Sequence, residues 1–176
     1  MRFRIVCLML TALVLALPAW AQSEASQVLE AKWWPSADAF ARGGTYPLVL
    51  MLTIKPDLHI NSHEPGDPDL IPTRIQFTAP PGLSLGPASF PRASKKKLGF
   101  TDKPIAVFHG AVLVRTMLKV AKDAKLGQQQ VIAKLSYQGC DANMCFMPES
   151  WEVPLEVKII PAGQKGLPLN KDLFAR

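Results

Sequence analysis

The stretch YQGCDANMCFMP, residues 137–148, places two cysteines five positions apart near the end of the chain. Aspartate and asparagine stand between the cysteines, and both residue types favour turns and tolerate left-handed backbone conformations. The preceding residues, 130–137, alternate apolar and polar side chains in the manner of a half-buried strand. We therefore predict a β-hairpin on which Cys140 and Cys145 stand opposite each other.

Short strands separated by turn residues account for most of the remaining chain. The 16 prolines suit turns and sheet edges and argue against a helical bundle. One of them, Pro154, indicates a sheet edge or a bulge within the last strand. A first strand is predicted to begin near Val28. The other predicted strands are Tyr46–Ile54, Leu58–Asn61, Thr73–Thr78, Ile105–Phe108, Ala111–Val120 and Trp151–Ile160.

This pattern predicts an all-β fold and, more specifically, a single β-sandwich. About seven to nine short strands at a spacing of roughly 8–12 residues, with turn signals between them, are typical of that architecture. We assign the sandwich to residues 22–160. Residues 161–176 are rich in glycine, proline and lysine, and we expect them to form a flexible tail.

Residues 1–21 have the features of a signal peptide. Two arginines precede the apolar run Ile5–Leu17, and Ala19-Trp20-Ala21 fits the small-x-small rule for cleavage. The apolar run is shorter than a membrane span requires, and no later stretch is long and apolar enough for one. We therefore expect export, with the loss of Cys7 together with the signal. A retained N-terminal anchor is the weaker alternative.

The chain after cleavage has 155 residues, which is enough for one domain with its own core. Its net charge falls from +6 to +4, because the signal contains two arginines and no acidic residue. The basic run Lys95–Lys97 is better explained by a solvated loop than by a binding patch, and export argues against nucleic acid as a partner. The two remaining cysteines would enter an oxidising compartment, which favours their pairing.

A disulfide between cysteines so close in sequence would contribute little to stability. Chain entropy gives about 2 kcal/mol for a loop of about six residues, against about 4.7 kcal/mol for a loop of a hundred. An accessible disulfide that closes a turn is suited to thiol–disulfide exchange. The residues alone thus favour a redox pair over a structural one, and the glycine before Cys140 hints that this cysteine is the more approachable.

Metal binding and an inert disulfide are the alternatives. Cysteine and methionine are soft ligands that suit Cu(I). The ligands that such a site would draw on are Cys140, Met144, Cys145 and Met147, with His59, His63 and His109 as further candidates. Two cysteines on a hairpin form an incomplete zinc set, however, and methionine more often packs than ligates. We assign no metal and no cofactor, and keep a copper-binding or structural interaction module as the alternative.

The hairpin motif resembles the active-site hairpin of the N-terminal periplasmic domain of DsbD. The motif runs from Tyr137 through both cysteines to an aromatic residue and a nearby proline, Pro148. The similarity extends to residues 54–60, 90–108 and 112–120. That domain is an immunoglobulin-like thiol–disulfide interchange module of a transmembrane reductant transporter. The resemblance thus implies an immunoglobulin-like antiparallel β-sandwich and a thiol–disulfide oxidoreductase or electron-transfer module.

The resemblance also implies roles for particular residues. Cys140 and Cys145 would be the redox pair, and Phe100, with Leu98 and Gly99 before it, would form a cap that shields the disulfide. The partners would be periplasmic proteins of the thioredoxin-like or disulfide-isomerase type. A membrane protein that transports reductant would supply the electrons.

The sequence departs from that family in three respects. Four residues separate the cysteines, one fewer than in the best-known members. His59 and Asn61 stand where two tyrosines lie near the site, and with Tyr137 they are the expected neighbours of the cysteines. The transmembrane and thioredoxin-like domains are absent, so we expect a stand-alone module. Which cysteine attacks first is left open by the sequence.

Overall fold

Alternating apolar residues form the strands of two facing β-sheets, as the sequence predicts. The computed structural model describes residues 24–99, 101 and 103–174, so the predicted signal peptide and Phe100 lie outside the described residues. In the strand Ala111–Val120 (β10), every second side chain is buried. The described part of the chain contains one short helix, Lys171–Phe174 (α1), and no helix with the length and apolarity to cross a membrane.

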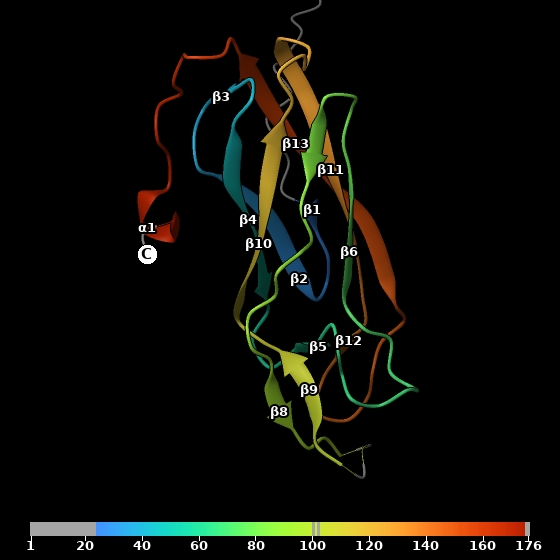
Figure 1. Cartoon of the computed structure of the whole chain (residues 1–176). Coiled ribbons are helices and arrows are strands. Elements are labelled where there is room, and N and C mark those ends of the chain that lie inside the picture. The colour runs from blue at the N-terminus through green and yellow to red at the C-terminus, as the bar shows by residue number, and fades with distance from the viewer. Residues whose placement is uncertain (1–23, 100, 102, 175–176) are drawn as a thin grey trace, which may run out of the picture.

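The first sheet of the sandwich is antiparallel throughout. In spatial order, its strands are Glu24–Ala25 (β1), Leu29–Pro35 (β2), Thr45–Ile54 (β4), β10 and Leu83–Leu85 (β7). The long pair of β4 and β10 forms its centre, in a register that pairs Leu50 with Val114 (Figure 1).

The second sheet lies across the core from the first (Figure 1). In spatial order, its strands are Phe40–Ala41 (β3), Glu149–Ile160 (β13), Gly127–Tyr137 (β11) and Arg74–Thr78 (β6). Its pairs are antiparallel except for the short parallel contact of β3 with Ile159 and Ile160. Because β3 meets β13 only at that end, Pro154 lies at the sheet edge among the described strands, as predicted.

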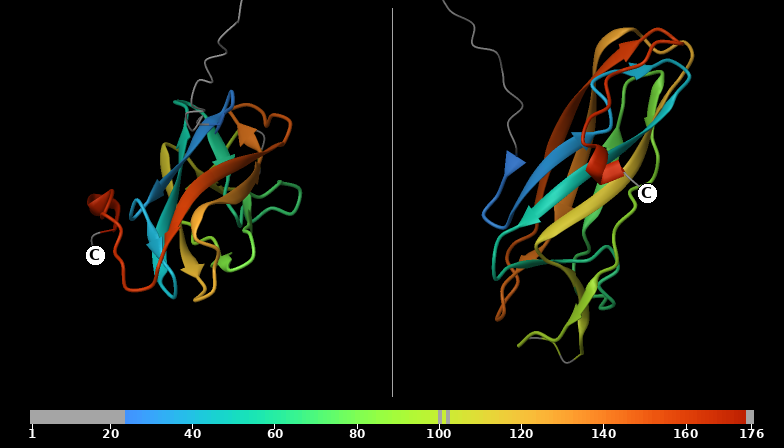
Figure 2. Two further views of the ribbon diagram at one scale, coloured as in Figure 1. Left: turned by 90° about the horizontal axis from the view of Figure 1, so that it is seen from above. Right: turned by 90° about the vertical axis from the view of Figure 1, so that its left-hand side faces the viewer.

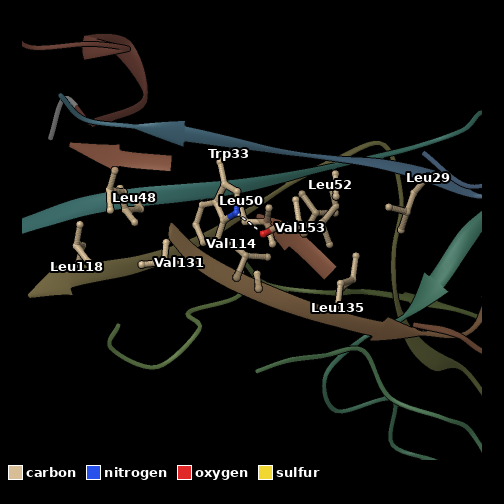
Figure 3. Close-up of a cluster of buried hydrophobic side chains, with 14 of the residues drawn as sticks. Leu29, Trp33, Leu48, Leu50, Leu52, Val114, Leu118, Val131, Leu135 and Val153 are labelled. Carbon is tan, nitrogen blue, oxygen red and sulfur yellow. Dashed lines mark hydrogen bonds between the residues drawn. The ribbon is translucent and has the colours of Figure 1, made fainter. Parts of the chain in front are cut away.

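Apolar side chains from both sheets fill the space between them (Figure 3). Trp33 of β2 spans this core and donates a hydrogen bond from its indole Nε1 to the carbonyl oxygen of Val153 in β13, over 2.9 Å. A buried indole N–H needs such a partner, because leaving it unpaired costs desolvation energy. The all-β sandwich predicted from strand spacing is therefore confirmed, and Trp33 joins its two sheets.

A third, smaller sheet lies at one end of the sandwich (Figure 1). In spatial order, its strands are Gly139–Cys140 (β12), His59–Asn61 (β5), Ile105–Phe108 (β9) and Ser94–Lys96 (β8). Ile60 and Phe108, which pair across β5 and β9, belong to the main core. Because successive strand residues point to opposite faces, the residues beside them point away from that core. There, Leu98 packs with Ile105 and Val107 in a separate apolar cluster.

Residues 161–174 run beside the sandwich (Figure 2). The amide of Asp38 donates to the carbonyl of Leu167 over 3.1 Å, and the amide of Leu169 donates to the carbonyl of Ser36 over 2.8 Å. Near the end of the tail, Arg115 donates from Nη1 to the carbonyl of Leu173 over 2.8 Å. The sequence did not suggest these contacts, and the flexibility of the segment stays a prediction.

The hydrogen bond of Trp33 leads to a stability prediction. Replacing Trp33 with phenylalanine removes the donor to Val153 and part of the buried ring, so the free energy of unfolding should fall by about 2 kcal/mol. The neighbouring Trp34 is a matched control, because its Nε1 has no hydrogen-bond partner among the described residues. Trp34→Phe should cost less than about 1 kcal/mol. Urea unfolding of both variants measures the difference, and equal losses would contradict the role of Trp33.

Candidate functional site

The two cysteines are joined by a disulfide at the end of the small sheet. Cys140 ends β12, and Cys145 returns to pair with it in a single antiparallel bridge. The Cα atoms of the two cysteines lie 3.9 Å apart, closer than the roughly 4.5–5.5 Å expected for opposed residues of regular strands. The connection is thus a very tight turn.

Asp141 holds this turn in shape. Its carboxylate Oδ1 accepts hydrogen bonds from the amides of Asn143, over 2.7 Å, and Met144, over 2.8 Å. Its own amide donates to the carbonyl of Met144 over 3.0 Å. The bonds from the two amides hold the pKa of the Asp141 carboxyl below its usual value. The aspartate singled out as a turn former therefore closes the loop through its side chain as well as its backbone.

The two sulfur-bearing residues differ in their exposure to solvent. Cys140 is fully buried, whereas Cys145 is partly exposed and lies between two exposed methionines, Met144 and Met147. The hint that Cys140 is the more approachable cysteine is wrong. The glycine before it reflects close packing, because a Cβ atom at Gly139 would lie 2.7 Å from a methyl group of Val28. An incoming group would meet Cys145 first.

Gln138 ties the hairpin to its surroundings, and the sequence reasoning did not single it out. Its Oε1 accepts from Asn61 Nδ2 over 3.2 Å and from the amide of Ile71 over 3.3 Å. Its Nε2 donates to the carbonyl of Phe146, the residue after Cys145, over 3.2 Å. Its position two residues before Cys140 was the only indication of this role in the sequence. Asn61 and Ile71 are distant from it in the chain, so the bonds to them could not be predicted.

Of the three predicted neighbours, His59 lies directly opposite Cys140, in the register of β5 with β12. Its side chain is 1% exposed, and neither ring nitrogen has a hydrogen-bond partner among the described residues. Burial, reinforced by the positive charge of Lys96, holds the pKa of His59 below its usual value. Asn61, two residues further on, is buried and donates from Nδ2 to Gln138 Oε1, its side-chain link to the hairpin among the described residues.

Tyr137 lies in the core. Its ring is fully buried and packs edge-on against Trp151, with ring centroids 5.3 Å apart. Its hydroxyl forms a 2.7 Å hydrogen bond with Ser26 Oγ, a partner that the sequence did not indicate. Burial raises the pKa of this phenol. Among the described contacts, the hydroxyl bonds to Ser26 and not to a cysteine sulfur.

The segment expected to form the cap lies against the hairpin. Leu98 is buried in the small apolar cluster of β9, and the amide of Gly99 donates to the carbonyl of Ala142 over 3.3 Å. Thr101 Oγ1 accepts from the amide of Leu98 over 3.1 Å and closes the segment on itself. Gly99 therefore contacts the turn between the cysteines, whereas Leu98 packs with Ile105 and Val107. Phe100, the expected shielding residue, lies outside the described residues, so its role stays a prediction.

Two of the histidines considered as copper ligands are engaged elsewhere. His63 stacks on Phe90, with centroids 4.7 Å apart, and lies parallel to Phe108 at 6.0 Å. His109 Nε2 lies 3.3 Å from Ser94 Oγ. Within residues 24–99, 101 and 103–174, no group of three or more His, Cys, Asp or Glu side chains is placed to hold a metal ion.

The buried imidazole predicts a pH-dependent stability. The unfolded chain protonates His59 near its ordinary pKa of 6.5, whereas the folded chain resists this protonation. The unfolded state therefore binds more protons as the pH falls below about 6.5, and the free energy of unfolding decreases. Urea unfolding of the oxidised protein between about pH 7.5 and pH 5 should show a smaller decrease in His59→Gln. Identical pH profiles for the two proteins would contradict the assignment.

The sequence matches a known family over most of its length. Residues 30–157 match the family described as the N-terminal region of the thiol:disulfide interchange protein DsbD. No curated protein matches the sequence.

Several solved structures are similar to this one. The N-terminal periplasmic domain of ScsB from Proteus mirabilis shares 14% sequence identity, with a TM-score of 0.49, over 80% of this chain and 49% of that chain. This chain thus spans about half the length of that one. The N-terminal domain of DsbD from Neisseria meningitidis, in its reduced form, shares 17% identity with a TM-score of 0.42, over 78% of this chain and 90% of that chain.

The GAE domain of GGA2p from Saccharomyces cerevisiae shares 12% identity with a TM-score of 0.44, over 75% of this chain and 93% of that chain. The sequence match to the DsbD family takes in both cysteines and β12, the strand that ends at Cys140. It also covers well over half of the chain. The chain therefore belongs to the family of the N-terminal domain of the thiol:disulfide interchange protein DsbD.

Proposed function

We propose that this protein is an exported thiol–disulfide interchange module that passes electrons to periplasmic protein partners through Cys140 and Cys145. One observation carries the proposal: a short hairpin disulfide joins a partly exposed sulfur-bearing residue to a fully buried one. Membership of the DsbD family supports the chemistry. The enzyme class is thiol–disulfide oxidoreductase, acting as an electron-transfer module without a cofactor.

The difference in exposure supports an order in which the two cysteines act. In the reduced protein, the Cys145 thiolate attacks a partner disulfide, forms a mixed disulfide and releases one partner thiolate. The Cys140 thiolate then attacks the sulfur of Cys145, closes the hairpin disulfide and releases the second partner thiolate. Two electrons pass to the partner, whose disulfide becomes a dithiol, and the protein ends oxidised. Only the first step needs a sulfur that a partner can reach.

The energetics of the hairpin favour exchange over a purely structural disulfide. A loop of about six residues stabilises the fold by about 2 kcal/mol on chain-entropy grounds. The sandwich has a large core of its own that includes Trp33 and the β4–β10 pair. Such a fold does not depend on a disulfide at one end for its stability. The hairpin disulfide can therefore open without unfolding the protein.

The proposed cellular setting follows from the sequence and the family. Residues 1–21 would direct export, and residues 22–160 would form the working domain. The partners would be thioredoxin-like or disulfide-isomerase-type proteins, and a membrane protein that transports reductant would be the donor. Leu98 and Gly99, with Phe100, would shield the disulfide until a partner displaces them. The contact of Gly99 with Ala142 supports this arrangement.

Cysteine variants test the proposed order of attack. Cys140→Ala leaves the exposed Cys145 without its resolving partner, so mixed disulfides should accumulate in periplasmic extract. Cys145→Ala leaves only the buried Cys140 and should trap at least about tenfold less partner, because burial restricts access. Non-reducing electrophoresis, followed by identification of the trapped proteins, measures both. The double variant Cys140→Ala, Cys145→Ala is the control. Equal trapping by the two single variants would contradict the assigned order.

The reduction potential separates exchange from an inert disulfide. Structural disulfides of secreted proteins have potentials below about −300 mV, whereas exchange proteins lie above that value. We expect the Cys140–Cys145 couple to lie above about −300 mV when equilibrated with glutathione or thioredoxin buffers. A potential far below that range, together with no trapped partner, would overturn the proposed function.

A further inference from the structure

His59 is a buried polar side chain whose ring nitrogens form no hydrogen bond with the described residues of the oxidised protein. The ring is 1% exposed, and both nitrogens lack a partner among the described residues. Burying a polar group without a hydrogen bond costs free energy, so native proteins seldom do it. An imidazole at this position therefore needs an explanation that the oxidised structure does not supply.

The strand register places the imidazole beside the disulfide. His59 pairs with Cys140, and opposed residues of an antiparallel pair share a face with Cβ atoms about 4.5–5.5 Å apart. Val107, which pairs with Asn61, lies on the same face of the small sheet and packs with Leu98. The His59 ring and the Cys140 sulfur are therefore enclosed on the side of the sheet that faces away from the main core.

Burial, together with the nearby charges, holds the pKa of His59 below its ordinary value. Lys96 of β8 and His109, in the turn between β9 and β10, oppose protonation of the ring, whereas Asp141 on the hairpin favours it. Burial is the largest influence and also opposes it. A neutral imidazole carries one N–H donor, and a disulfide sulfur is a poor acceptor. The donor gains a strong acceptor only when the sulfur becomes a thiolate.

We propose that His59 donates a hydrogen bond to the Cys140 thiolate and stabilises it whenever the hairpin disulfide is opened. The proposal rests on the proposed function. The thiolate of a reductant attacks the sulfur of Cys145 and forms a new sulfur–sulfur bond. The Cys140–Cys145 bond breaks, and its electron pair goes to the Cys140 sulfur. The negative charge moves from the attacking sulfur to Cys140, and no proton is transferred.

This arrangement explains why an imidazole suits the position. Cys140 is fully buried, so water does not solvate the charge that forms on its sulfur. A hydrogen bond to a charged group is stronger than one between neutral groups. His59 thus supplies the hydrogen bond that water would otherwise donate to the Cys140 sulfur. It should lower the pKa of the Cys140 thiol and make the disulfide easier to reduce.

A thiolate titration tests the inference without any partner protein. In the Cys145→Ala background, the ultraviolet absorbance of the thiolate reports Cys140 alone. His59→Leu should lower the thiolate-forming equilibrium constant of Cys140 by about tenfold or more. His59→Gln keeps an N–H donor and should restore most of the effect. His109→Leu removes the weakest of the charges that act on the His59 ring and should change the titration much less than His59→Leu does.

The complete pair provides a second readout. With both cysteines present, His59→Leu should decrease the equilibrium constant for reduction by about tenfold, equal to about 30 mV for a two-electron couple. His59→Gln should remain close to the unmodified protein. Circular dichroism and urea unfolding show whether each variant is folded before its titration is compared.

A third measurement needs no change at His59. In the Cys145→Ala protein, the nitrogen-15 resonances of the His59 ring should shift with the same midpoint as the thiolate absorbance. The inference is overturned if those resonances do not respond, if His59→Leu leaves the Cys140 titration unchanged, or if His59→Gln behaves like His59→Leu. Failure of the proposed function would appear elsewhere, as an absence of trapped partners beside a normal His59-dependent titration.

Discussion

The pairing of β5 with β12 is the constraint on which the site depends. Two register pairs, Ile60 with Gly139 and His59 with Cys140, bind the hairpin to the small sheet. Ile60 belongs to the main core, so the alternation of a strand obliges His59 to point to the opposite face, beside the cysteine. Packing of Ile60 in the core thus determines that His59 lies beside the disulfide. Both β5 and β12 lie at one end of the sandwich.

The disulfide is asymmetric because its two ends have different surroundings. Cys140 lies where strand pairing and close packing of Gly139 on Val28 exclude solvent. Cys145 lies on the return of the turn, where a single bridge, the bond from Gln138 to Phe146 and the bond from the Met144 amide to Asp141 hold the backbone. Cys145 is therefore partly open to solvent, whereas Cys140 is fully buried. This difference in exposure is a property of the fold, since both residues are chemically the same.

Local pattern predicts the parts of the structure that depend on neighbours in sequence. The long strands follow from alternation, as in β10, and the turn follows from Asp141 and Asn143. The burial of Cys140 and His59 was not predictable in this way, because it comes with strand pairings between segments far apart in the chain, β5 with β12 and with β9. Gln138 was missed for the same reason. A glutamine two residues before a cysteine does not indicate a structural role until its partners Asn61 and Ile71 are known.

The turn between the cysteines is held by bonds that do not involve sulfur. Asp141 fixes the amides of Asn143 and Met144 through its carboxylate, and these bonds need no disulfide to form. A loop that keeps its shape after reduction would hold the two sulfurs at a high effective molarity, as well-oriented intramolecular reactants are. Ring closure would then outpace most competing reactions at Cys145. The lifetime of any covalent complex with another protein would be set by how strongly that protein hinders Cys140, and not by a search for the second sulfur.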